Sequence, residues 1–143
     1  MKKKLFPNET VLKTKYFDIH QDWEVPILGF FIIASVRDIK SVADFTGDEL
    51  EEFGRLLRQM RIGMRDVLNI KEVYLFQRED SEHGFHVWIF PRHEWMEKFG
   101  RKSESMRPII NYAKENMVNE EASREVREMV SAMRVYMERF IKI

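Results

Sequence analysis

The segment from His86 to Arg92 contains the side chain best suited to chemistry, because an imidazole can act as nucleophile, base or acid near neutral pH. The run Phe85–Phe90 is aromatic or β-branched apart from His86, which predicts a strand that Pro91 ends. Alternation along this strand puts Gly84, His86, Trp88 and Phe90 on one face and Phe85, Val87 and Ile89 on the other. A single histidine in a strand is usually structural, so its surroundings must decide. The polar loop Arg78–His83 directly precedes it and is able to contact a ligand.

A metal site is the second chemistry that histidines in this region suggest. The candidate ligands are His83, His86 and His93. In a regular strand His83 and His86 point to opposite faces, and the chain has no cysteine to complete a site. We therefore predict no metal and no other cofactor. His83 reaches the same face as His86 only if the chain bends between them.

The composition bounds the protein that must position His86. A chain of 143 residues is about one domain, and 44% hydrophobic residues suffice for a core. The 24 basic and 24 acidic residues balance, which argues against a general nucleic-acid binder. No apolar run of secretory or membrane-spanning length follows the basic start at Met1–Lys4. We expect a cytoplasmic protein with neither a nucleic-acid nor a membrane partner.

Four strands are predicted, two in each half of the segment that ends at Pro91. Their ranges are Val11–Ile19, Gly29–Ser35, Val73–Gln77 and Phe85–Phe90. Gln21–Pro26 reads as a turn, because Pro26 lacks a donor and biases Val25 to an extended conformation.

A long helix separates the two pairs of strands. Thr46 is a suitable N-cap and Glu49 completes a capping box, while Asn69 is a plausible stop. Apolar residues recur at helical spacing and predict the buried face: Leu50, Phe53, Leu57, Met60, Met64 and Val67. The predicted fold is α+β, an antiparallel sheet with the Thr46–Leu68 helix packed on it and a C-terminal helical extension.

The chain after Pro91 reads as helical. We predict a short helix over Glu94–Gly100, a second over Ser105–Asn116 with Pro108 in its first turn, and a long third helix capped by Asn119. The third helix has an apolar stripe that fits a core or a subunit interface better than a cofactor site: Val126, Met129, Val130, Met133, Tyr136, Met137, Phe140 and Ile141.

The segment His86–Arg92 resembles the end of the histidine-triad motif of nucleotide hydrolases and transferases. In that motif three histidines alternate with apolar residues, and the strand commonly closes in Pro-Arg. Aligned on Pro91 and Arg92, the three triad positions of this sequence are Gly84, His86 and Trp88. Only the middle histidine is present.

The chain upstream strengthens the resemblance, which covers roughly Val11 to Arg92. Asp22 lies eight residues before Phe30, a spacing similar to that between the family's ribose-binding carboxylate and its turn histidine. A turn at Leu28–Phe30 enters an apolar strand, and the stretch from Arg37 to Glu49 resembles the family's basic segment and helix start.

The resemblance implies a function for particular residues. His86 is expected to attack the α-phosphorus of a nucleotide and form a nucleotidyl-histidine intermediate, which water then hydrolyses. It implies a purine nucleotide or dinucleoside polyphosphate, such as diadenosine tetraphosphate, or a nucleoside phosphoramidate as substrate. Asp22 is expected to hold ribose, and Gln77 and Arg92 to contact phosphate; Arg92 pairing with Glu94 or another acid is equally open. Phe17, Ile19 and Ile33 are candidates for the base pocket.

The departures from the family pattern leave a second function open. Gly84, Trp88 and Phe30 replace histidines at substrate-facing positions, and Asp38 replaces the one that often follows the basic segment. An indole only donates, so Trp88 lacks half of the role of histidine and fits a core residue better than a stacking group. Loss of acid–base help typically costs about 10²–10⁴-fold in rate. The alternative is therefore a non-catalytic nucleotide-binding or interaction protein.

The resemblance also implies an organisation. Residues 1–100 are expected to form the histidine-triad-like domain, and residues 101–143 a helical extension packed on the same domain or on a dimer partner. Family members commonly form homodimers, so we expect a homodimer here.

Overall fold

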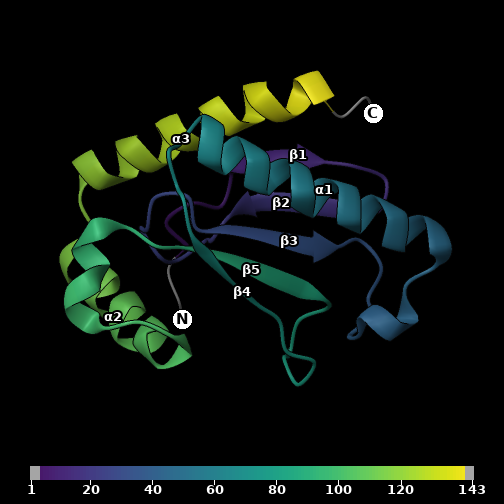
Figure 1. Ribbon diagram of the computed structural model, residues 1–143, viewed down its shortest axis with the longest axis horizontal. Helices are drawn as coiled ribbons and strands as arrows, with labels where there is room; N and C mark the ends of the chain where they lie inside the picture. Colours follow the sequence, from purple (N-terminus) through teal and green to yellow (C-terminus); the bar gives the residue numbers. More distant parts are fainter. Residues whose placement is uncertain (1–3, 141–143) are drawn as a thin grey trace.

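Five strands form one antiparallel sheet in the computed structural model, which describes residues 4–140 (Figure 1). The order across the sheet is β1-β2-β3-β5-β4. The strands are β1 (Thr10–Lys13), β2 (Phe17–Gln21), β3 (Phe31–Ser35), β4 (Val73–Phe76) and β5 (His86–Pro91). The predicted α+β class with an antiparallel sheet is confirmed.

The helices lie on both sides of this sheet, with α1 and α3 over one face and α2 against the other (Figure 1). They are α1 (Gly47–Asp66), α2 (Met106–Asn116) and α3 (Glu120–Phe140), with short 3₁₀ turns at Val42–Asp44, Glu94–Phe99 and Ser103–Ser105. The predicted cap of the last helix is confirmed, because the Asn119 side chain accepts from the Ala122 N–H at 2.8 Å. Within residues 4–140, no helix combines the length and apolar character that crossing a bilayer needs.

The first predicted strand is wrong, because Val11–Ile19 contains a hairpin. β1 and β2 pair antiparallel, with Lys13 opposite Asp18. Thr14 closes the turn: its N–H donates to the Phe17 carbonyl at 2.8 Å, and its hydroxyl accepts from the Phe17 N–H at 3.1 Å. The loose apolar alternation carries through both strands, so periodicity alone did not reveal the reversal.

The side chains on the two faces of β5 pack in two different cores, as the predicted alternation requires. Val87 and Ile89 pack in the core that α1 and α3 cover, whereas Trp88 and Phe90 pack in the core that includes α2. The buried face of α1 is rotated from the predicted stripe: Leu56 is buried, while Leu50 is 57% exposed. Met60 and Met64 are buried as predicted.

The C-terminal helix α3 covers the edge of the sheet at β1. It buries Val126, Val130, Met133 and Met137, which are four members of the predicted stripe. The Arg134 guanidinium donates to the Thr10 carbonyl of β1 at 2.7 and 3.0 Å. Phe140 is 53% exposed, and Ile141 lies outside the described residues.

An ion pair between the half-exposed Arg37 and the buried Glu49 fixes the start of α1. The predicted capping box forms, since the Thr46 hydroxyl accepts from the Glu49 N–H at 3.1 Å and the Glu49 carboxylate accepts from the Thr46 N–H at 2.8 Å. The Arg37 guanidinium also binds Glu49 in bidentate fashion, at 2.7 and 2.9 Å, and donates to the Asp44 carbonyl at 2.7 Å. The segment between β3 and α1 is therefore tied down at both ends.

This ion pair makes stability depend on pH. Hydrogen bonds from Arg37 chiefly, and from the Thr46 backbone, lower the pKa of Glu49 from 4.5 to about 2. A carboxyl with a lowered pKa stabilises the fold above its unfolded pKa, and that contribution is lost as the pH falls from 4.5 towards 2.

We expect Glu49→Gln to lower the free energy of unfolding by about 2 kcal/mol near neutral pH, because a charge-assisted pair is lost. Urea unfolding between about pH 7 and 2 should show a shallower acid loss than in the unmodified protein. Glu51→Gln is the matched control, since that side chain is 74% exposed and forms an exposed pair with Arg55 four residues on. An equal acid loss in the Glu49 variant and the unmodified protein would contradict the assignment.

Candidate functional site

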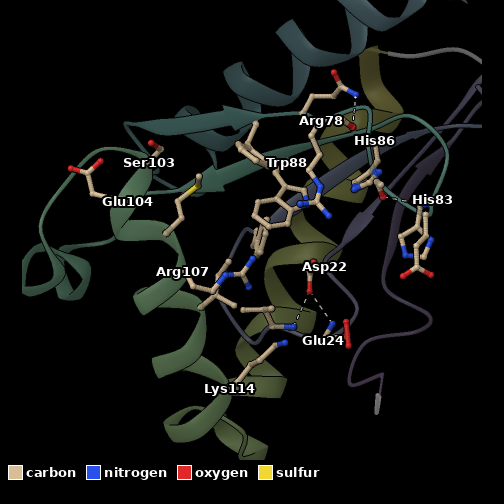
Figure 2. Close-up of a pocket in the computed structure, with 18 residues that line it drawn as sticks. Asp22, Glu24, Arg78, His83, His86, Trp88, Ser103, Glu104, Arg107 and Lys114 are labelled. Carbon is tan, nitrogen blue, oxygen red and sulfur yellow. Dashed lines mark hydrogen bonds between the residues drawn. The ribbon is translucent and has the colours of Figure 1, made fainter. Parts of the chain in front are cut away.

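A cleft of about 580 Å³ lies between the end of the sheet that holds His86 and the helix α2 (Figure 2). Three parts of the chain contribute its walls: the turn between β2 and β3, strands β4 and β5 with their connecting loop, and the start and one face of α2. Its lining residues are Asp22, Glu24, Val25, Phe30, Phe76, Gln77, Arg78, Ser81, Glu82, His83, His86, Trp88, Ser103, Glu104, Met106, Arg107, Ile110 and Lys114.

His86 lies at the first position of β5 with its ring oriented by the backbone. Its Nδ1 is 2.9 Å from the Gly84 carbonyl oxygen. A carbonyl oxygen only accepts, so Nδ1 carries the hydrogen and the neutral ring has its lone pair on Nε2. Pairing of His86 with Ala34 of β3 fixes the backbone. The arrangement therefore provides a positioned nitrogen nucleophile in the wall of the cleft.

His83 also lines the cleft, because the loop bends before β5. The His83 and His86 ring centroids are 6.1 Å apart with the ring planes nearly perpendicular (Figure 2). The Lys40 ammonium holds the bend by donating to the carbonyls of Ser81 and His83. His83 was expected to reach the site only if the chain bends between His83 and His86, and the chain bends there in the structure.

Asp22 lines the cleft from the turn between β2 and β3. Its Oδ1 accepts from the N–H groups of Glu24 and Val25, both at 2.9 Å (Figure 2). Burial raises the pKa of this carboxyl, and the two backbone donors oppose that rise. Its other oxygen makes no hydrogen bond with a described residue, so it is available to a ligand hydroxyl.

The buried Gln21 and the partly buried His93 hold the turn that carries Asp22. The Gln21 amide donates to the Ile27 carbonyl at 2.8 Å, and His93 Nε2 donates to the Leu28 carbonyl at 2.6 Å. Gly29 completes the turn with φ of +77°, a conformation that favours glycine. His93 is thus a structural residue, and burial lowers its pKa.

An aromatic group forms the floor of the cleft. Trp88 packs edge-on against Phe30 at 5.3 Å between ring centroids and tilted against Phe76 at the same distance. Phe30 is fully buried, while Trp88 is partly exposed. Two of the positions where the family pattern has histidines therefore carry aromatic side chains at the cleft, with Trp88 at its surface and Phe30 beneath it.

The other predicted contacts differ in their placement. Gln77 lines the cleft, although its amide donates to the carbonyls of Arg78, at 2.9 Å, and Lys40, at 3.3 Å. Gly84 is not among the lining residues. A Cβ at Gly84 would lie 3.5 Å from the Asp38 carboxylate and the Ile39 carbonyl, so this position faces the segment after β3.

Arg92 lies outside the cleft, which corrects the predicted phosphate contact. Its side chain is 3% exposed and pairs with Glu97 at 3.4 Å. It also donates to the Gly100 carbonyl at 2.9 Å and the Ser105 hydroxyl at 3.3 Å. Arg92 therefore joins the end of β5 to the turns that precede α2.

The predicted base pocket is also wrong. Phe17, Ile19 and Ile33 are fully buried in the core beneath α1 and α3, on the face of the sheet opposite the cleft. The apolar surface on the cleft side comes instead from Val25, Phe30, Phe76, Trp88, Met106 and Ile110.

Sequence reasoning missed the contribution of α2. Arg107, Ile110 and Lys114 are spaced three and four residues apart, so they lie on one face of the helix, and that face lines the cleft (Figure 2). This spacing can be read from the sequence and indicates a shared helix face. The predicted helix over Ser105–Asn116 was nevertheless not assigned to the site. Within residues 4–140 no group of three or more histidine or acidic side chains is arranged to hold a metal ion.

The turn that carries Asp22 provides a test of the geometry. We expect Asp22→Ala to lower the free energy of unfolding by about 2 kcal/mol, because two backbone N–H groups lose their acceptor. Asp22→Asn keeps an acceptor oxygen and should cost less. Because a raised pKa means that ionised Asp22 opposes folding, the stability of Asp22→Asn relative to the unmodified protein should increase as the pH rises above 3.8. Equal losses for both variants in urea unfolding would contradict the two bonds.

Comparison with known proteins identifies the fold. No protein-family model matches the sequence, and no curated protein sequence matches it. Among solved structures, the diadenosine triphosphate hydrolase of Plasmodium falciparum, in complex with cyclomarin A, is similar with a TM-score of 0.64 and 13% identity over 95% of this chain and 80% of that chain. A zinc-bound histidine-triad family protein from Mycobacterium smegmatis has a TM-score of 0.57 and 12% identity over 87% of this chain and 85% of that chain.

A third similar structure is the NitFhit protein of C. elegans, with a TM-score of 0.54 and 14% identity over 74% of this chain. The match spans only 26% of the NitFhit chain. These likenesses, together with the five-stranded antiparallel sheet, show that the chain has the α+β fold of the histidine-triad proteins.

Proposed function

We propose that this protein is a divergent member of the histidine-triad superfamily that hydrolyses or transfers nucleotides through a nucleotidyl-histidine intermediate. The observation that carries the proposal is His86, whose Nδ1 is bound to the Gly84 carbonyl so that Nε2 offers its lone pair in a cleft that Asp22 also lines. Histidine-triad proteins of the same fold include a diadenosine triphosphate hydrolase, which supports a nucleotide as ligand.

The chemistry has two displacement steps. His86 Nε2 attacks the α-phosphorus, a P–N bond forms, and the bond from phosphorus to the leaving group breaks with its electron pair going to the leaving group. Water then attacks the same phosphorus and the P–N bond breaks, which returns the electron pair to His86. Asp22, with one oxygen left free by the turn, accepts a hydrogen bond from a ribose hydroxyl.

His83 is the group best placed to move the proton that these steps need. The leaving group must gain a proton and the attacking water must lose one, and imidazole does both near neutral pH. The 6.1 Å separation of the two ring centroids leaves both rings within reach of one phosphate group. His83 would then take over the proton transfer that is missing at the triad positions of Gly84 and Trp88.

The substrate classes that follow are dinucleoside polyphosphates, such as diadenosine tetraphosphate, and nucleoside phosphoramidates. The base lies against the aromatic and aliphatic surface that includes Phe76 and Trp88. Residues 1–100 as the histidine-triad-like domain, a cytoplasmic location and a homodimer stay predictions. Size-exclusion chromatography with light scattering tests the dimer.

One observation favours the alternative of a non-catalytic nucleotide-binding or interaction protein. Trp88, at the third triad position, packs against Phe30 and Phe76, and its indole N–H donates a hydrogen bond but accepts no proton from a substrate. A protein of this kind binds nucleotide in the same cleft without turnover.

The substitution His86→Ala separates the two functions. With diadenosine tetraphosphate and an AMP phosphoramidate as substrates, we expect kcat to fall by at least about 10⁴-fold, because the nucleophile is lost. Acid-labile labelling of the unmodified protein by a radiolabelled adenylyl group should be absent from the variant. Circular dichroism and thermal unfolding check that the variant folds. Nucleotide binding without turnover, unchanged by the substitution, would refute the enzyme and support the binding protein.

The role of His83 is tested against Glu79, another residue of the same loop. We expect His83→Ala to lower kcat by about 10²–10³-fold and to change the pH–rate profile, because a proton donor is lost. Glu79→Ala is the control: this side chain is exposed and does not line the cleft, so activity and stability should stay near those of the unmodified protein. An unchanged kcat and pH–rate profile in His83→Ala would contradict the assignment.

A further inference from the structure

The wall of the cleft opposite the sheet carries two cations that the proposed reaction does not use. Arg107 and Lys114 project from α2 into the cleft, with Ile110 between them on the same helix face (Figure 2). Asp22 and His86 come from the turn and the strand on the other side. A ligand in the cleft therefore meets cations from a second direction.

Neither cation is neutralised by the protein within residues 4–140. Arg107 and Lys114 form no ion pair or side-chain hydrogen bond there, although the same cleft is lined by four acidic residues, Asp22, Glu24, Glu82 and Glu104. By contrast, Arg78 at the cleft pairs with Asp80 at 3.4 Å, and Arg101 at the turn before α2 pairs with Glu97 and Glu72. The two cations of α2 are thus free to bind an anion.

The helix that carries them is firmly held. Ile109 and Ala113, on the side of α2 away from solvent, are fully buried and pack in one core with Phe30 and Phe90. The turn before α2 is fixed as well, since the Ser105 hydroxyl donates to the Lys102 carbonyl at 2.7 Å and accepts from the buried Arg92 guanidinium. Because the helix is anchored, the backbone of Arg107 and Lys114 keeps a constant position relative to His86, and their exposed side chains extend from this fixed base.

We propose that Arg107 and Lys114 form a second anion subsite, which binds phosphates beyond the one that His86 attacks. Guanidinium and ammonium groups form charge-assisted hydrogen bonds with phosphate oxygens, which are roughly twice as strong as hydrogen bonds between neutral groups. The proposal rests on the proposed function for the identity of the first phosphate. It deepens that function by assigning the substrate class: a nucleotide with a chain of several phosphates.

The subsite distinguishes the two substrate classes left open above. A dinucleoside polyphosphate places further charged phosphates beyond the α-phosphorus, and these reach the cations of α2. A phosphoramidate places an amine there, which gains nothing from them. The cations should therefore favour a polyphosphate leaving group, which they hold while the P–O bond breaks.

The test measures binding separately from turnover. Inorganic tripolyphosphate, AMP and ATP are titrated in the absence of divalent cations into the unmodified protein and into the double variant Arg107→Ala/Lys114→Ala, by calorimetry. The matched control is Arg58→Ala/Lys71→Ala, which removes the same two charges at exposed positions outside the cleft. We expect the double variant to lose at least about tenfold in affinity for tripolyphosphate and ATP and little for AMP, while the control stays unchanged.

Turnover of diadenosine tetraphosphate and of an AMP phosphoramidate is measured on the same proteins. A fall in kcat/KM for the polyphosphate alone supports the subsite, and an equal fall for both substrates overturns it. If no protein turns over either substrate but tripolyphosphate binding still depends on Arg107 and Lys114, the enzyme proposal fails and the subsite stands. If tripolyphosphate does not bind, or binds equally to the double variant and the control, the subsite is overturned whatever the activity.

Discussion

The pairing of β3 with β5 is the constraint on which the rest of the structure depends. It joins segments more than fifty residues apart, with Phe31 opposite Ile89 and Ala34 opposite His86. This pairing places β5 inside the sheet, flanked by β3 and β4, and the strand carries apolar side chains on both faces, such as Ile89 and Phe90, which must be covered. It also fixes the position of His86 at the end of the strand, where the cleft begins. The long α1 connection between β3 and β4 is the means by which the chain returns to make this pairing.

Because side chains alternate along β5, one face of the strand packs in the core and the other face lines the cleft. Val87 and Ile89 enter the core under α1 and α3, while His86 and Trp88 face the other side. On that side the sheet needs a cover, and α2 supplies it by burying Ile109 and Ala113. The helix covers the sheet near Phe30 and Phe90 but stops short of closing over His86, which leaves the cleft between them. A segment that the resemblance did not cover thus becomes a wall of the site.

Local signals predicted much of this fold. The capping box of Thr46 and Glu49, the strand ending at Pro91 and the cap at Asn119 each depend on a few adjacent residues, and each was found. The hairpin at Thr14 was missed because apolar residues alternate through the reversal. The burial of Leu56 in place of Leu50 depends on how α1 rotates against the sheet and α3. Arg92 was misplaced because its partners Gly100 and Ser105 lie beyond the motif, and packing between distant segments leaves no local pattern.

The surroundings of the triad positions restrict which groups can replace the missing histidines. Trp88 is held by Phe30 and Phe76, and a side chain at position 84 would face Asp38 and Ile39, so the strand cannot supply another proton carrier from the triad positions. In the proposed reaction, groups that assist His86 would come from elements that the motif does not include. The bent loop supplies His83, which Lys40 holds in place, and α2 supplies two cations that pair with no residue in the described part of the chain. Lys40 lies in the segment that the Arg37–Glu49 pair anchors, so the position of His83 depends on an interaction remote from the cleft.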